Sequence, residues 1–138
     1  MKIAVSACLL GENCKYNGGN NYSKKVEEFI KGHDVIAICP EVLGGLPTPR
    51  EPAEIVNGKV CHARGDSVDK EFRAGAKKAL DIIKNNQVEL AILQSRSPSC
   101  GVNTIYDGTF SGKIIPGKGV FAELLHENHI KAIDVEDI

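Results

Sequence analysis

Short apolar runs and longer amphipathic stretches alternate along the chain. Continuous apolar runs bounded by charged or turn residues are typical of strands buried on both faces of a parallel sheet. Strands are assigned to residues 3–7, 34–38, 90–93 and 130–135, and the runs at 34–38 and 90–93 have this buried pattern. We expect each of them to form one strand.

Between these runs, apolar residues recur at helical spacing. The first helix is expected to begin after Ser23, an N-cap residue, and to end near Gly32. The longest amphipathic stretch covers residues 68–86, where apolar residues recur every three or four positions. A shorter helix is expected over residues 120–128.

A hairpin and three loops complete the pattern. Asn57-Gly58 stands between two apolar stretches within residues 54–63, which predicts a β-hairpin with Cys61 on its second strand. Residues 40–52 carry four prolines and a glycine pair, and we expect this segment to be a stiff loop without regular structure. Glycine-rich loops are expected at residues 11–22 and 107–119.

The order of these elements predicts an α/β fold. Strands that alternate with helices favour an open, mostly parallel sheet with helices on both faces. With 138 residues, the chain has the length of one domain, covering residues 1–138, and is long enough to bury a core. We therefore expect a single-domain, Rossmann-like three-layer sandwich with about four parallel strands and a small hairpin, whose ligands bind beyond the carboxyl ends of the strands.

Charge and hydropathy exclude two classes of partner. Lys and Arg number 17 against 18 Asp and Glu, so the basic footprint of a protein that binds polymeric nucleic acid is missing. No apolar run approaches the roughly 20 residues of a membrane-spanning helix. The N-terminal apolar run is too short for the core of a signal peptide, so we expect a cytoplasmic protein. Nothing in the sequence sets an oligomeric state.

Five cysteines are the candidate chemistry. No C-x-x-C pair occurs, which argues against a zinc ribbon or a thioredoxin motif. Cys8 follows the first predicted strand, Cys39 the second, and Cys100 lies a few residues after the third. Because the carboxyl ends of parallel strands share one edge of a sheet, these three thiols should meet there. Any one of them could be a core residue, but three together suit a soft metal or an iron-sulfur cluster with one open coordination position.

The other two cysteines are weaker candidates. Cys14 lies in the glycine-rich loop near Cys8 and could cap a cluster, act as a reactive thiol or be incidental, and we favour the last. Cys61 is interpreted as a core side chain of the hairpin.

Several motifs resemble those of a known family. The segments SACLLGENCKYNGG, CPEVLGGLPTPREPAEI, SPSCG and GKGVFAELL are similar to the thiouracil desulfidase-like family of small iron-sulfur proteins, and the similarity spans essentially the whole chain. The resemblance implies a 4Fe-4S cluster held by Cys8, Cys39 and Cys100, with the fourth iron free to bind sulfur. It also implies that Glu41 and Ser97 form the catalytic pair.

From this resemblance we expect a non-redox desulfuration of a small thiolated heterocycle, such as 2-thiouracil to uracil and hydrosulfide. Glu41 would accept a proton from the attacking water, and Ser97 would relay a proton or orient the ring. Arg50 is expected to brace its proline-rich loop rather than to bind an anion. Purification in air is expected to strip such a cluster or to replace it with zinc.

Three alternatives stay open. The same cluster could act on another thiolated metabolite or in sulfur trafficking toward tRNA thiolation. A regulatory or sensing module would instead hold a fully ligated metal or cluster, with Cys14 as the fourth ligand. A redox protein using Cys8 and Cys14 as a thiol pair is the least favoured, because the pair lacks a helix-borne C-x-x-C.

Overall fold

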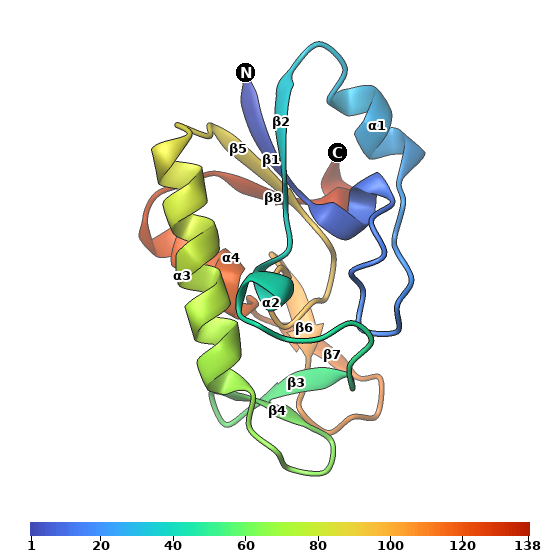
Figure 1. The fold of residues 1–138 in the computed structure, drawn as a ribbon. Coiled ribbons are helices and arrows are strands. Elements are labelled where there is room, and N and C mark those ends of the chain that lie inside the picture. The colour runs from blue at the N-terminus through green and yellow to red at the C-terminus, as the bar shows by residue number, and fades with distance from the viewer.

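A computed structural model describes residues 1–138 and contains a four-stranded sheet at its centre (Figure 1). The strands are β1 (Lys2–Ser6), β2 (Asp34–Ile38), β5 (Leu90–Leu93) and β8 (Ala132–Asp134). Their order is β2-β1-β5-β8, and every neighbouring pair is parallel. The predicted α/β class and parallel sheet are confirmed.

Helices cover both faces of the sheet. In Figure 1, α3 (Asp69–Asn85) and α4 (Val120–Glu127) lie on one side, and α1 (Lys24–Phe29) and the 3-10 helix η1 (Ala7–Leu10) lie on the other. A second 3-10 helix, η2 (Val135–Asp137), follows β8. The predicted three layers are therefore present. No helix combines the length and apolarity needed to cross a bilayer.

Alternation along β1 divides the core in two. Ala4 packs in the cluster under α3 and α4, whereas its neighbours Ile3 and Val5 pack in the cluster that contains Val26 of α1. Successive side chains of a strand point to opposite faces, so a continuous apolar run supplies both cores. The buried-strand interpretation is confirmed for residues 90–93, which are all buried in β5, but it is wrong for residues 34–38, because β2 is an edge strand in which only Ile38 is buried.

The chain also forms two antiparallel hairpins. The predicted one, β3 (Ala53–Val56) and β4 (Lys59–His62), turns at Asn57 and Gly58, which both have positive φ, as the turn type requires. The second hairpin consists of β6 (Thr104–Tyr106) and β7 (Ile114–Pro116). The expectation of a loop over residues 107–119 is wrong for β7, and no element was predicted at β6. Each strand has three residues, too few to show alternation, and a long glycine-rich connection joins them.

Residues 40–52 contain a short helix, α2 (Pro40–Leu43), so the expectation of no regular structure there is also wrong. Pro40 occupies the first turn, where its missing N–H interrupts no hydrogen bond. The helix crosses α3 at very close range, since a Cβ on Gly75 would lie 1.9 Å from the Pro40 carbonyl oxygen. A Cβ on Gly44, just after α2, would lie 2.0 Å from the Glu71 carbonyl oxygen. Glycine at both positions lets the two backbones touch and fixes α2 on the core.

Candidate functional site

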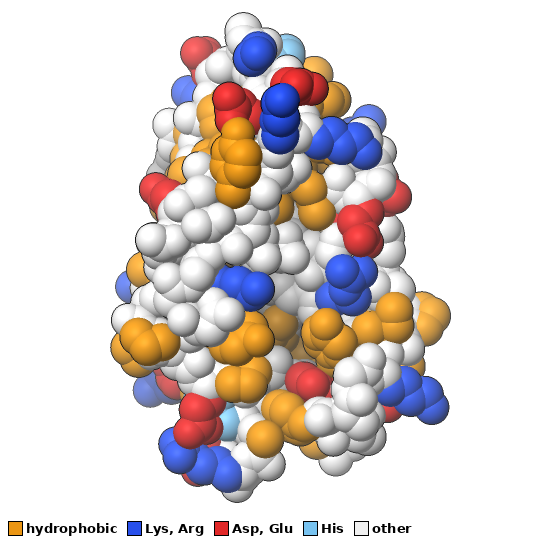
Figure 2. Space-filling model, turned by 90° about the vertical axis from the view of Figure 1, so that its right-hand side faces the viewer, with side chains coloured by type: hydrophobic (Ala, Val, Ile, Leu, Met, Phe, Trp, Pro, Cys, Tyr) orange, Lys and Arg blue, Asp and Glu red, His pale blue; other side chains and the backbone are white.

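Three cysteines follow three neighbouring strands at the carboxyl edge of the sheet. Cys8 lies in η1 directly after β1, and Cys39 precedes α2 directly after β2. Cys100 lies in a turn after β5. All three line one cavity of about 760 Å³. Figure 2, which views the molecule from the right-hand side of Figure 1, shows the surface hollowed near its centre, with Lys or Arg side chains on either side.

Burial makes this cavity unfavourable for free thiolates. It raises the pKa of the Cys8 thiol, although Asn21 Nδ2 donates to the sulfur at 3.5 Å and acts in the opposite direction. Burial raises the pKa of Cys100 to about 12. Cys14 also lines the cavity, and burial together with the neighbouring Cys39 raises its pKa to about 12. A bound cationic group would offset the cost of ionising these thiols.

The donor set is of the soft kind. Cys8, Cys39 and Cys100 bring three thiols to one cavity, and thiolates are the ligands that soft metals and iron-sulfur clusters prefer. The residues present therefore fit an iron-sulfur cluster.

Glu41 projects from α2, two residues after Cys39, and both of its oxygens are engaged. Oε1 accepts from Arg50 Nε at 3.1 Å and also lies 3.1 Å from Arg50 Nη2. Oε2 accepts from the Ser99 hydroxyl at 2.8 Å. The ion pair is largely buried, with 6% of the Arg50 side chain and 16% of the Glu41 side chain exposed. The carboxylate is therefore held in a fixed orientation at the cavity wall.

Arg50 connects Glu41 to two loops. Nη2 donates to the Cys14 carbonyl at 2.8 Å, and Nη1 donates to the Pro47 carbonyl at 3.1 Å and to Thr48 Oγ1 at 3.0 Å. The guanidinium thus braces its loop, as the sequence predicts. Sequence reasoning did not find that its charge partner is Glu41. Because Nε and both terminal nitrogens already donate to protein acceptors, little of this cation is available to a substrate anion.

Ser97 and Ser99 stand in one tight turn before Cys100. Ser97 Oγ accepts from the backbone N–H groups of Ser99 at 3.1 Å and Cys100 at 3.0 Å, and its distance to Ser99 Oγ is 2.9 Å. Ser97 therefore shapes the turn and also hydrogen-bonds toward Glu41 through Ser99. Sequence reasoning missed Ser99, for which the only signal was the second serine of SPSC.

This turn is docked on the N-terminus of α4. The carbonyl of Pro98 accepts from Val120 N–H at 2.8 Å, and the carbonyl of Ser99 accepts from Phe121 N–H at 2.9 Å. These bonds satisfy helix N–H groups that no capping side chain reaches. A Cβ on Gly119 would lie 2.6 Å from the Ser99 carbonyl oxygen, so the close approach requires glycine. The SPSCG and GKGVF motifs are therefore two sides of one backbone contact.

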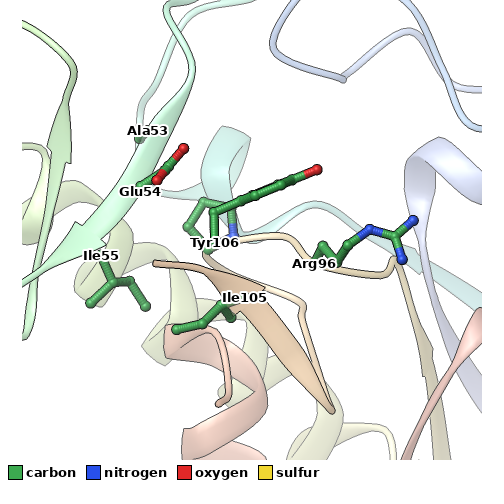
Figure 3. A pocket seen from close by; sticks show the side chains of 7 residues that line it. Ala53, Glu54, Ile55, Arg96, Ile105 and Tyr106 are labelled. Carbon is green, nitrogen blue, oxygen red and sulfur yellow. The ribbon is translucent and has the colours of Figure 1, made fainter. Parts of the chain in front are cut away.

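The two hairpins form the outer wall of the cavity. Tyr106 of β6 and Phe110 of the following loop line it. Glu54 of β3 joins the hairpins, because Oε1 accepts from the backbone N–H groups of Gly108 at 3.0 Å and Phe110 at 3.1 Å. Figure 3 shows a shallow pocket beside the cavity, where the Tyr106 side chain lies between Glu54 and Arg96. The sequence predicted the β3–β4 side of this wall but carried no signal for its aromatic side, which depends on the hairpin that was not predicted.

The remaining cysteine lies apart from the others. Cys61 is on β4, opposite Glu54, and is not among the residues that line the cavity. It is half-buried and belongs to neither core cluster, so the prediction of a core side chain is wrong. The alternation of the short strand places its neighbour Val60 in the core instead.

Comparisons with known proteins agree with one another. The model of the 2-thiouracil desulfurase family matches residues 3–137. The uncharacterized protein YbbK of Bacillus subtilis (strain 168) is 40% identical over 146 residues, which cover 99% of this chain and 97% of that protein. The solved structure of the 4Fe-4S-dependent thiouracil desulfidase TudS (DUF523Vcz) is 38% identical and superposes with a TM-score of 0.92, covering 99% of this chain and 92% of that chain.

Proposed function

The chain belongs to the 2-thiouracil desulfurase family, and from this premise we propose that it removes sulfur from a small thiolated nucleobase, converting 2-thiouracil and water to uracil and hydrosulfide. The observation that carries the proposal is the meeting of Cys8, Cys39 and Cys100 at a cavity that Glu41 and Ser97 also line. The related solved structure is named as a 4Fe-4S-dependent desulfidase, and a cluster of this kind would account for three thiols at one cavity.

Cys8, Cys39 and Cys100 are the proposed ligands of a 4Fe-4S cluster whose fourth iron has no protein ligand. When bound, such a cluster supplies a soft Lewis acid that polarises a thiocarbonyl group. The surrounding chain adds hydrogen bonds to the ligand sulfurs, from Asn21 to Cys8 at 3.5 Å and from Ser99 to Cys100 at 3.7 Å. Such donors favour the thiolate form and tune a cluster.

Glu41 and Ser97 are the proposed catalytic pair. Water adds to the thiocarbonyl carbon while Glu41 accepts one of its protons, so a C–O bond forms as the C–S bond breaks. The sulfur leaves as hydrosulfide with the other proton. Glu41 then releases its proton to water, so the carboxylate is restored and no electron is gained or lost overall. Arg50 keeps the carboxylate in place, and the Ser97 hydroxyl orients the ring or transfers a proton to it.

The cavity suits a neutral, planar substrate. Tyr106 and Phe110 on its outer wall offer aromatic faces on which a heterocycle can stack. Arg50, the buried cation of the cavity, already donates to Glu41 and to three loop acceptors. Arg50 is therefore not the group that would bind an anionic substrate, and the stacking surfaces match a free thiolated base.

The test is anaerobic reconstitution with iron and sulfide, followed by the visible spectrum, the iron content and the formation of uracil and sulfide from 2-thiouracil. The unchanged protein should bind about four irons and be active. The variants Cys8→Ala, Cys39→Ala and Cys100→Ala should each lose the cluster and the activity, while the matched control Cys61→Ala keeps both. A cluster-free parent protein, or a cluster that survives loss of one of the three ligands, would overturn the proposal.

A second candidate is a cluster-binding regulatory or sulfur-trafficking module without desulfidase activity. It is favoured by one observation, that Cys14 lines the same cavity next to Cys39 and could close the site as a fourth ligand. The variant Cys14→Ala separates the two. Retention of the cluster with full activity supports the open site, whereas loss of the cluster supports the closed one.

A further inference from the structure

The loop that joins β6 to β7, residues 107–113, contains a strained phenylalanine. Three of its residues have positive φ, Gly108 at 90°, Phe110 at 57° and Gly112 at 83°. Glycine adopts this conformation without steric cost, whereas a bulky side chain there is strained. Two of the three positions carry the residue that the backbone favours. Phe110 occupies the third, where glycine would be the unstrained choice.

Core packing does not account for this strain. Phe110 belongs to neither hydrophobic core cluster, nor to the partly buried residues that pack against them. Thr109 and residues 111–113 are exposed, whereas Phe110 is half-buried and lines the cavity. The ring therefore turns inward from an otherwise exposed loop tip, and the surface that it contributes to is that of the cavity.

Contacts with β3 hold the backbone of Phe110 in this conformation. Glu54 Oε1 accepts from the N–H groups of Gly108 at 3.0 Å and Phe110 at 3.1 Å. A Cβ on Gly108 would lie 2.7 Å from the Ile55 carbonyl oxygen, so the loop lies directly against the strand. Strain of this kind persists only where surrounding contacts impose it, and it clusters at ligand-binding sites.

The other aromatic ring of the wall reaches the cavity without strain. Tyr106 lies on β6, where its neighbour Ile105 is buried and alternation places Tyr106 on the opposite side. Its side chain lies next to Glu54 in Figure 3, the residue that also holds the backbone of Phe110. The two rings therefore belong to one wall, and only Phe110 needs a special backbone conformation to be part of it.

We propose that Phe110 determines the specificity of the site for planar, aromatic heterocycles, because its ring stacks on the ring of the substrate. This inference rests on the proposed desulfuration and narrows its substrate class. A saturated ring with the same N–H and C=O groups is puckered and has no π face, so it gains little from an aromatic neighbour. The strained backbone is the cost of presenting the ring at the cavity.

The test compares uracil, the proposed product, with dihydrouracil, in which one ring double bond is saturated. Calorimetry on the reconstituted protein gives the dissociation constant of each ligand. We expect the parent protein to bind uracil about tenfold more tightly, because stacking of a base on an aromatic side chain contributes a factor of this size. Phe110→Ala should lose this preference by binding uracil more weakly, and Phe110→Tyr, which keeps a ring face, should retain it.

Phe29→Leu is the matched control, because it removes a ring that is 43% exposed on α1 and does not line the cavity. It should keep the preference for uracil, and the iron content should be the same in all variants. An unchanged preference in Phe110→Ala, or an equal loss of affinity for both ligands, would overturn the proposed role. Absence of uracil binding in the parent protein would overturn it as well.

A readout without ligand tests the strain itself. Phe110→Ala and Phe110→Gly both remove the ring, but only glycine relaxes a backbone with a φ of 57°. In cluster-free protein, Phe110→Gly should unfold about 3 °C above Phe110→Ala, a shift in the range that a modest strain produces in a domain of this size. The same two substitutions at Ser111, where φ is not positive, should give the opposite order, because glycine raises the entropy of the unfolded chain.

The outcomes separate this inference from the proposed function. If Phe110→Gly unfolds below Phe110→Ala, the position is not strained and the inference fails, whatever the activity. If the parent protein prefers uracil through Phe110 but does not desulfurate 2-thiouracil, the reaction is rejected and the selection of planar rings still holds.

Discussion

The inner rim and the outer wall of the cavity are built in different ways. The rim carries the candidate ligands and acid-base groups on backbone that is clamped by direct contact, α2 against α3 and the 97–101 turn against α4. The wall consists of two short hairpins, and β7 is exposed along its whole length. Glu54 joins the hairpins through two hydrogen bonds to backbone N–H groups. The proposed chemistry is thus placed where the backbone is fixed, and the proposed substrate contacts where few interactions hold the chain.

This difference predicts that equivalent substitutions have unequal effects on the two regions. Rim substitutions should lower the stability of the whole protein and the occupancy of the site together. Wall substitutions should change substrate binding while the fold and the cluster survive.

The largest effect is expected at Arg50. Arg50→Ala leaves the buried Glu41 carboxylate without its cation and removes the donors to three loop acceptors. Breaking a buried ion pair by removing one partner costs about 4 kcal/mol. Denaturant unfolding of cluster-free protein measures this loss in the free energy of unfolding. Arg50→Lys is the matched variant, because it keeps the charge but loses the planar fork of donors. A loss below about 1 kcal/mol, the value typical of exposed pairs, would show that the rim is not held through this residue.

A somewhat smaller effect is expected at the crossing of α2 and α3. Helix propensity alone predicts that Gly75→Ala stabilises a helix interior by about 1 kcal/mol. The Pro40 carbonyl oxygen, 1.9 Å from the new Cβ, predicts the opposite sign, a loss of about 3 kcal/mol. The matched variant Ala74→Gly, on the exposed side of α3, should follow propensity. Calorimetry of the parent protein, Gly75→Ala and Ala74→Gly compares their unfolding temperatures. A stabilised Gly75→Ala would mean that α2 is free to shift.

The sequence predicted the parts of the fold that local patterns specify. Continuous apolar runs supply side chains to two cores at once, so the strands of the parallel sheet were recognisable. Ser23 was recognisable as an N-cap, and its hydroxyl accepts from Val26 N–H at 3.2 Å. Because the carboxyl ends of parallel strands share one edge of a sheet, the sequence also indicated that Cys8, Cys39 and Cys100 lie near one another. These are patterns in which each residue contributes through its immediate neighbours.

What the sequence did not predict depends on contacts between distant segments. The helix α2 could not be predicted within the proline-rich segment, because a helix of four residues has no periodicity and is stabilised by its contact with α3. The Arg50 to Glu41 pair and the Ser99 bridge join three segments, and no local signal marks such partners. The hairpin of β6 and β7 was missed because strands of three residues are too short to show alternation, and the aromatic side of the wall was missed with it.

On the wall, Glu54→Ala should affect substrate binding more than stability. The variant loses the carboxylate that accepts from Gly108 and Phe110, so the loop carrying Phe110 is released from β3. We expect KM for 2-thiouracil to rise about fivefold, the equivalent of roughly 1 kcal/mol, with unchanged kcat and iron content. The KM of Glu54→Gln, which keeps one acceptor oxygen, should lie between those of the parent protein and Glu54→Ala. A loss of iron in Glu54→Ala would contradict the separation of rim and wall.

The smallest effect is expected at Arg64, the exposed counterpart of Arg50. Its guanidinium contacts two carboxylates, Glu51 at 2.9 Å and Asp66 at 2.6 Å, and the hydrogen bond to Asp66 raises the pKa of Arg64 above its usual value. The side chain is 65% exposed, against 6% for Arg50, so water screens both pairs. Arg64→Ala should therefore leave the unfolding temperature, the iron content and KM unchanged. Arg64 has two carboxylate partners and Arg50 has one. A measurable loss of stability in Arg64→Ala would therefore mean that pairing rather than burial sets the contribution of the two arginines, and the contrast between rim and wall would have to be drawn on other grounds.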